Sequence, residues 1–271
     1  MLRLPWEPIR LIPLGDIQAG IEACDLGLLK RAVQRGVSED AWFIGMGDYL
    51  DVASPSNRKM LRATPLYDSV RDMMDAQMRK QEDDLMEVLY PTTGRWLGML
   101  EGHHTWEYQT GETTDTNLCR TLGAPFLGHC GLIRLNFQSP GTQVSCTIFA
   151  HHGVGSGTSV GAPLVKLERV VEWCEADLYL MGHQHKRVAG HIPRFYMTNG
   201  SQPELLARER LLVGTGSYLR GYLQGGRSGG RAGGSYVEQA MMRPVSLGSP
   251  TVLIRPVRAG SHNLIEFETM T

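Results

Sequence analysis

Five short, mostly apolar segments in the first 185 residues are each followed by side chains of types that bind metal ions. The segments are predicted strands, because each is a short apolar run that ends at a glycine or a polar turn. They span residues 9–14, 41–46, 96–100, 144–150 and 177–181, and the side chains that follow are Asp16, Asp48, His103–His104, His151–His152 and His183 with His185. In α/β sheets, ligand chemistry lies just beyond the carboxyl ends of the strands. The repetition therefore predicts one site assembled from five strand ends.

Apolar residues recur at helical spacing between these segments. The periodicity predicts helices near residues 26–36 and 70–89, and Pro163 marks the start of a third helix that runs to Cys174. Further apolar runs predict strands at residues 190–196, 211–218, 252–254 and 264–267. The fold class is therefore α/β, and we expect a single domain over residues 1–271, with the metal-binding motifs in 16–185 and closing strands in 186–271.

Composition and charge argue against several classes of protein. A formal net charge of −1 and a pI near 6.8 argue against charge-driven binding of duplex nucleic acid. These values are compatible with a local basic groove. The chain has no apolar run of about 18 residues and no signal-peptide pattern, so we expect no membrane association. Its five cysteines have no C-x-x-C spacing, which indicates neither a disulfide framework nor a zinc ribbon. A cytoplasmic protein with reduced cysteines is the simplest interpretation.

Aspartate and histidine together suit Mn²⁺, Zn²⁺ or iron better than they suit a thiolate-bound structural zinc. The candidate ligands are too numerous for one ion, so two ions are expected. Each cluster taken alone also has a structural explanation. Asp16 could cap a turn, and a pair of histidines could lie in a solvated loop. Asp51 is more typical of a group that fixes the turn or supports a ligand than of a ligand itself.

The order of these motifs resembles the calcineurin-like metallophosphoesterase family, whose pattern runs D-x-H, G-D-x-x-D, G-N-H-[ED], H-x-[PG] and G-H-x-H. G-D-Y-L-D at residues 47–51 and G-H-Q-H at residues 182–185 match that pattern well. The resemblance implies a four-layer αββα sandwich of two mixed β-sheets flanked by helices, with a dinuclear metal site at one edge. The segment after residue 185 loosely resembles uncharacterised members encoded by bacteriophages.

Carried over by position, the resemblance implies that Asp48 bridges two divalent cations. Mn²⁺ is the expected metal, with Zn²⁺, Fe or Ni²⁺ as alternatives. One cation would be held by Asp16, Asp48 and His185, with Gln18 where the family usually has a ligand histidine. The other would be held by Asp48, His103, His151 and His183. Of the neighbours His151 and His152, we expect the first to be the ligand because it fits H-x-G, and the second to lie close by.

His104 takes the place of the family's proton-donating histidine, so His104 and Asp48 are the expected catalytic residues. Thr105 stands where the family has an acidic residue that orients this histidine, and Glu107 is a candidate substitute. A glycine-rich segment at residues 221–234 has Arg220, Arg227 and Arg231 in or beside it. It is either a surface connection or a cationic flap that closes on phosphates.

The activity implied is hydrolysis of a phosphate ester by a hydroxide that bridges the two cations, with His104 as the acid. We expect a phosphodiesterase of the nuclease type, because a leaving-group acid suits poor alkoxide leaving groups. The expected substrate is a phosphate ester such as single-stranded nucleic acid or a nucleotide. One alternative is a phosphomonoesterase or small-nucleotide hydrolase. Another is a metal-binding scaffold of weakened activity, which Gln18 and Thr105 would explain.

Overall fold

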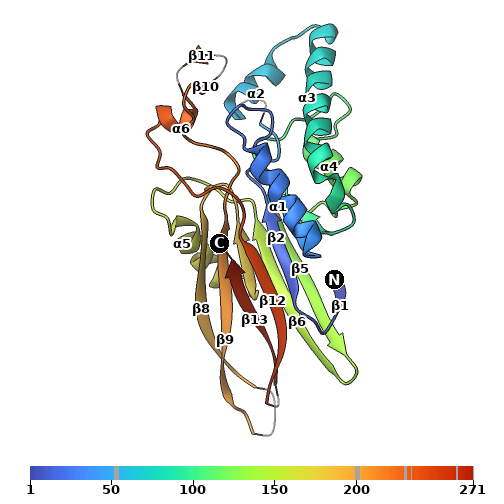
Figure 1. The fold of residues 1–271 in the computed structure, drawn as a ribbon, viewed down its shortest axis with the longest axis vertical. Coiled ribbons are helices and arrows are strands. Elements are labelled where there is room, and N and C mark those ends of the chain that lie inside the picture. The colour runs from blue at the N-terminus through green and yellow to red at the C-terminus, as the bar shows by residue number, and fades with distance from the viewer. Residues whose placement is uncertain (52–54, 199–201, 229–230, 233, 261, 271) are drawn as a thin grey trace.

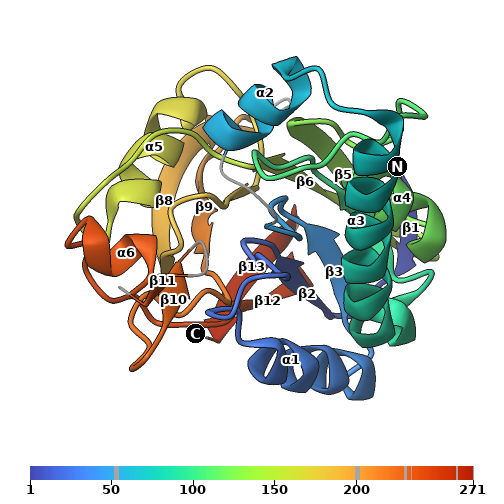
Figure 2. The same ribbon diagram turned by 90° about the horizontal axis from the view of Figure 1, so that it is seen from above.

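Two mixed β-sheets pack face to face, and helices cover their outer faces (Figures 1 and 2). The architecture is that of a computed structural model, which describes residues 1–51, 55–198, 202–228, 231–232, 234–260 and 262–270. The four layers, helix, sheet, sheet and helix, confirm the sandwich of two mixed sheets expected from the sequence.

Each of the two large sheets contains a set of three parallel strands. The larger has six strands in the order β1 (Leu2–Pro5), β5 (Cys130–Ser139), β6 (Thr142–His151), β7 (Leu178–Met181), β9 (Leu205–Thr215) and β8 (Arg187–Met197). The smaller has five, in the order β13 (His262–Met270), β12 (Thr251–Ala259), β2 (Ile9–Leu14), β3 (Trp42–Gly45) and β4 (Trp96–Met99). Strands β2, β3 and β4 run parallel to one another, as do β6, β7 and β9. The loops after each parallel set therefore leave at one edge of its sheet.

The strands that lead to these loops are buried on both faces. In β7, Leu178 and Leu180 lie in the core between the sheets, whereas Tyr179 and Met181 lie in the core beneath α5 (Ala162–Val171). Successive side chains of a strand point to opposite faces, so both cores draw on the same short segment. This is why β7 is a continuous apolar run in the sequence and not an alternating one.

Helices α1 (Leu26–Ser38), α3 (Asp68–Leu89) and α4 (Thr114–Leu122) cover the smaller sheet, and α5 covers the larger one (Figure 2). Helix α1 begins where the carboxylate of Asp25 accepts a hydrogen bond from the backbone N–H of Leu28, at 2.9 Å. A short turn, η1 (Tyr90–Thr92), ends α3 at the predicted place. No helix in the described parts of the chain combines the length and the apolar character needed to cross a membrane.

The small elements α2 (Pro55–Ala63), β10 (Arg227–Ser228), β11 (Arg231–Ala232) and α6 (Tyr236–Gln239) stand at one end of the molecule, drawn at the top of Figure 1. Seen from that end in Figure 2, α2 lies at the top and α6 at the left of the loops that follow the parallel strands. The candidate site lies among these loops.

Pro13 lies inside β2, although proline cannot donate a ladder hydrogen bond. Strand β12 pairs with β2 only over residues 9–11, so at Pro13 the described partner is β3 alone. The missing N–H therefore faces a side where the ladder has already ended, and the strand tolerates the proline.

Candidate metal centre

The residues after the parallel strands turn sharply into one region. Five of the seven described non-glycine residues with positive φ lie here: Asp16 (46°), Gln18 (52°), Asp48 (53°), His183 (63°) and His185 (56°). Left-handed backbone is unfavourable for residues with a Cβ and persists only where the surroundings enforce it. Its concentration at the predicted ligands shows that the fold holds these side chains in set directions.

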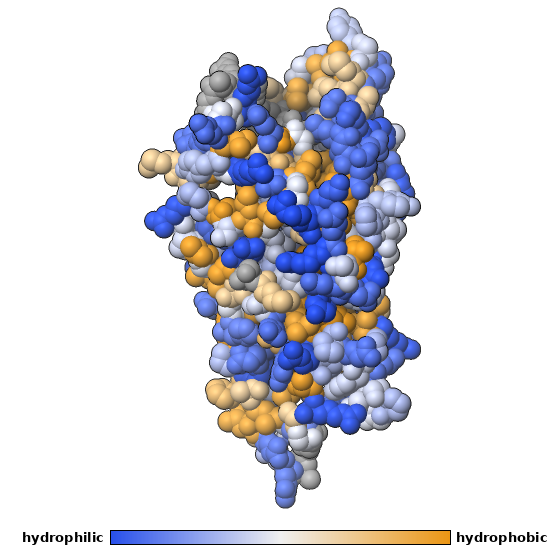
Figure 3. All heavy atoms as spheres, in the orientation of Figure 1, coloured by the Kyte–Doolittle hydropathy of each residue, from blue (hydrophilic) through white to orange (hydrophobic). Residues whose placement is uncertain are grey.

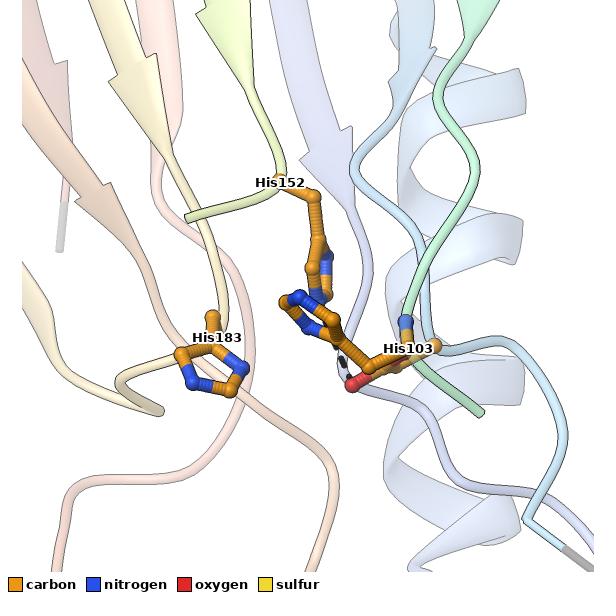
Figure 4. A group of neighbouring side chains, drawn as sticks. His103, His152 and His183 are labelled. Carbon is orange, nitrogen blue, oxygen red and sulfur yellow. Dashed lines mark hydrogen bonds and ion pairs between the residues drawn. The ribbon is translucent and has the colours of Figure 1, made fainter. Parts of the chain in front are cut away.

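Asp48, His103, His152 and His183 form the group that we call the compact site. One potential ligand atom from each residue lies within 4.8 Å of those from the other three. The centroid of the His103 ring lies 4.6 Å from that of His152 and 4.7 Å from that of His183. Figure 4 shows the three rings converging. Atoms that bind one ion at about 2.0–2.2 Å are separated by roughly 3–4.4 Å. The compact site therefore fits a divalent cation with small side-chain adjustments.

Backbone contacts fix Asp48 in the compact site. Its Oδ1 accepts hydrogen bonds from the N–H groups of His103 (2.5 Å) and His104 (2.9 Å). Gly102 permits this approach, because a Cβ there would lie 2.1 Å from both the backbone N and Oδ1 of Asp48. The N–H of Gly102 in turn donates to the buried carboxyl of Asp115 in the first turn of α4. Helix α4 thus holds the histidine-bearing loop against Asp48.

Asp16, Gln18 and His185 form a second group, the amide site. The Nε2 of His185 lies 3.6 Å from Oδ1 of Asp16 and 3.5 Å from Nε2 of Gln18. The other oxygen of Asp16 accepts the N–H of His183 at 2.8 Å, which joins the two groups. Rotating the Gln18 amide by a half turn would exchange its oxygen and nitrogen, so that the oxygen would lie beside Nε2 of His185.

Buried acceptors without hydrogen-bond partners occur in the amide site. They include Oδ1 of Asp16 and Oε1 of Gln18. A buried acceptor without a partner is costly, and a cation is one way to satisfy several at once. The four ligand atoms of the compact site fit a divalent cation, and the unsatisfied oxygens of the amide site are of a kind that can bind one.

Burial sets the charge of most candidate ligands. It raises the pKa of Asp16 to about 8 and lowers the pKa of His183 and of His185 to about 4. Burial also lowers the pKa of His103. Neutral imidazoles present the lone pair that a cation needs, so these histidines are suited to metal binding at neutral pH.

His152 and Asp48 behave as a pair. Burial alone would lower the pKa of His152, but its contact with Asp48, 3.3 Å from Nε2 to Oδ2, raises the pKa to about 9. Burial would also raise the pKa of Asp48, but the hydrogen bond and charge of His152 and the charge of His104 hold it well below its usual range. A cation held by both residues would replace the proton that they share.

His104 pairs with Asp51, whereas we expected Glu107 to orient it. Its Nδ1 lies 2.8 Å from Oδ1 of Asp51, a buried residue, and its Nε2 lies 3.9 Å from Oδ2 of Asp48. Burial lowers the pKa of His104, but the hydrogen bond to Asp51 and the charges of Asp48 and Asp51 outweigh this, so the pKa is raised. Asp51, not Glu107, is therefore the carboxylate beside His104. Glu107 is exposed, and its backbone pairs with that of Thr113.

The structure also corrects the choice between the two neighbouring histidines. His151 is the last residue of β6, and its side chain follows Phe149 to the face that packs on α5, with ring centroids 6.5 Å apart. Its Nδ1 accepts the N–H of Gly153 at 2.7 Å. His152 lies one residue beyond the strand and enters the compact site, where its Nδ1 contacts the carbonyl of Met46 at 2.6 Å. The two-residue period of β6 places the two side chains on opposite faces, but which face meets the site depends on the packing of the sheets.

Of the three arginines of the expected flap, the structure describes the side chains of Arg220 and Arg227. Arg220 is bound to Asp25 at the start of α1, with 2.7 Å between Nη2 and Oδ2. Arg227 lies in β10 with an exposed side chain. Residues 229–230 and 233 and the side chain of Arg231 lie outside the described parts of the chain. Arg227 is therefore the described arginine that remains a candidate for closing over a bound phosphate.

No family model matches the sequence, and no curated protein sequence does either. Among solved structures, the chain is similar to Vacuolar Protein Sorting 29 from Cryptosporidium parvum, with 11% identity, a TM-score of 0.35, and coverage of 98% of this chain and 99% of that one. It is also similar to a conserved uncharacterized protein from Streptococcus pneumoniae, described as a predicted phosphoesterase, with 13% identity, a TM-score of 0.30, and coverage of 97% and 90%. These TM-scores indicate a distant likeness, so the function proposed below rests on the side chains of the site.

Proposed function

We propose that this protein is a metal-dependent phosphoesterase that hydrolyses phosphodiester bonds. The compact site would hold one divalent cation, and the amide site, together with Asp48, would hold the other. Oxygen and imidazole ligands suit Mn²⁺, which we propose as the metal of both sites. When bound, two such cations polarise phosphoryl oxygens and lower the pKa of a water molecule between them.

The chain's own contribution is to position groups around the phosphate. Asp48 is held by two backbone N–H groups, so its free oxygen has a set direction toward the compact site. His104 is held by Asp51 through Nδ1, which leaves Nε2 on the side of Asp48. A protonated imidazole in this position can donate its Nε2 proton to the leaving oxygen of the substrate, a role that typically contributes about 10²–10⁴-fold to the rate.

The observation that carries the proposal is the His104–Asp51 pair beside the compact site. A metal-binding scaffold has no need for an imidazole whose pKa is raised and which is not itself part of the ligand group. A leaving-group acid matters most for alkoxides, which leave poorly, and this favours diesters over activated monoesters. The specific observation in favour of a scaffold is Gln18, because an amide oxygen is a weaker ligand than an imidazole.

Turnover of three substrates by the Mn²⁺-loaded protein tests the proposal. We expect hydrolysis of an aryl phosphodiester and of single-stranded DNA, with slower hydrolysis of an aryl phosphomonoester. Asp48→Asn should reduce turnover of both diesters by at least about 10²-fold. His104→Ala should reduce turnover of single-stranded DNA by at least about 10²-fold and that of the aryl diester much less, because an aryl oxide leaves readily without an acid. His191→Ala, which alters an exposed histidine of β8, is the matched control. Activity on the monoester alone would replace the diesterase by a monoesterase, and a metal-loaded protein inactive on all three would favour the scaffold.

A further inference from the structure

A cavity of about 260 Å³ is lined in part by the loop that follows His104. Helix α2, the segment that joins it to α3, the first half of α3 and the loop after His104 form its walls. The lining residues are Leu61, Leu66, Arg71, Met74, Asp75, Trp106, Glu107, Tyr108, Gln109 and Gly111. In Figure 3, apolar side chains interrupt the polar surface at the upper end, where α2 and α3 meet in Figure 1.

Two chain segments connect this cavity to His104. Trp106 lies two residues after His104, and its backbone is tied to Thr114 by hydrogen bonds in both directions, so the loop is fixed at the start of α4. Helix α2 follows shortly after Asp51 and carries Arg58, a buried residue whose charge is close enough to act on the His104 imidazole. Leu61 lies three residues further on, on the same face of α2. Helix α2 therefore supplies both a charge that acts on His104 and an apolar residue of the cavity wall.

The walls and rim of the cavity differ in chemistry. Leu61, Leu66 and Met74 line it with half-buried apolar side chains, and Trp106, 8% exposed, forms a fixed part of the wall. The indole N–H of Trp106 donates to Oδ1 of Asp75 at 2.9 Å. Such apolar walls with a few polar groups are typical of small-molecule sites.

Polar groups line one side of the same cavity. The backbone N–H of Gln109 donates to Oδ2 of Asp75 at 3.2 Å, and its side-chain amide donates to Asp72 at 3.1 Å. Arg71 and Glu107 are exposed at the rim. At about 260 Å³ the cavity is smaller than the roughly 300–1,000 Å³ of pockets for drug-sized ligands, so it has room for one ring system. The hydrogen bonds among Trp106, Asp75 and Gln109 fix this wall in place. A flat ring with apolar faces matches a cavity of this size and lining.

We propose that this cavity binds the nucleobase of the leaving group, so that the preferred substrate is a phosphodiester whose departing alcohol is a nucleoside. The assignment to the leaving-group side rests on the proposed function, because it follows from the role of His104 as the acid. Base binding to such a surface is sequence-tolerant, since every base has apolar faces. The cavity would then set substrate class while the metal centre performs the chemistry.

Calorimetric titration of the metal-loaded protein with adenosine tests the cavity without any turnover. We expect saturable binding of adenosine and none of ribose. Leu61→Glu and, independently, Leu66→Glu should weaken adenosine binding about ten-fold or more, because each introduces a charge into an apolar wall. Met60→Glu is the control on the same helix, since Met60 is 61% exposed. No adenosine binding, or binding that both wall variants retain, would overturn the proposal.

Kinetics then place the bound base on the leaving side. We compare a dinucleoside monophosphate with the methyl ester of the same nucleotide, in which the departing nucleoside is replaced by methanol. The ratio of their kcat/KM values should fall about ten-fold in Leu61→Glu and stay as in the wild type in Met60→Glu. An unchanged ratio in Leu61→Glu overturns the leaving-group assignment. If neither ester nor an aryl diester is hydrolysed while adenosine binds, the proposed function fails and the base site stands. Comparing hydrolysis of a ten-nucleotide single-stranded DNA with that of the dinucleoside monophosphate shows whether the base comes from a nucleic acid or from a small dinucleotide.

Discussion

The compact site and the amide site lie at the same edge of the sandwich but differ in how complete they are. The compact site combines one carboxylate and three imidazoles within 4.8 Å, supplied by loops after both sheets. The amide site has one carboxylate and one imidazole, and its third member is the weaker ligand Gln18. Because ligand number and strength determine affinity, the two groups should bind their cations with different affinities.

Removal of one histidine from each group should separate the two affinities. His183→Ala should weaken the tighter Mn²⁺ equivalent by at least about 10²-fold, whereas His185→Ala should remove only the weaker equivalent. Calorimetry and metal analysis after gel filtration measure both, and circular dichroism reports whether each variant is folded. Loss of the tighter equivalent in His185→Ala would reverse the ranking of the two sites.

Asp51→Asn should reduce kcat by about 10–100-fold with little change in metal content, because Asp51 contacts His104 and not the ligand group. The amide keeps the shape of the side chain but removes the charge that favours the protonated imidazole. Turnover of single-stranded DNA, whose leaving group is an alkoxide, with metal analysis on the same sample measures the effect. A variant that loses metal as well as activity would show that Asp51 supports the ligands instead of His104.

Gln18→His should strengthen the amide site. Gln18 has a φ of 52°, and histidine is among the residues that occupy this region more readily than most. We expect the weaker Mn²⁺ equivalent to bind about ten-fold more tightly, while Gln18→Met should weaken it. Titration of both variants side by side checks the direction. Unchanged affinity in both would exclude residue 18 from the metal centre.

His151→Ala should have the smallest effect on metal content, within about two-fold of the wild type, because this side chain packs toward α5. His152→Ala is its matched partner and should lose the tighter equivalent. A modest loss of stability is expected in His151→Ala, since the N–H of Gly153 loses its acceptor. Loss of metal in His151→Ala but not in His152→Ala would restore the assignment made from the sequence motif.

The elements with strong periodicity were predictable from the sequence. Strands β2, β3, β4, β6 and β7 and helices α1, α3 and α5 lie close to the predicted ranges, because buried apolar runs and helical stripes are local signals. Strand β5 and helices α2 and α4 were not predicted. Polar residues make up much of α2 and α4, and β5 has several exposed positions, so packing against neighbours decides their structure.

The sequence by itself determined the kinds of ligand and the order in which they follow the strands, since a strand, a glycine and a ligand are neighbours along the chain. Only the tertiary structure decided which of two adjacent histidines enters the site and which carboxylate meets His104. Side-chain direction in β6 turns His151 toward α5, and Asp51 reaches His104 across 53 residues of sequence. Both outcomes depend on where two loops from different strands meet, and that meeting is fixed by the packing of the two sheets.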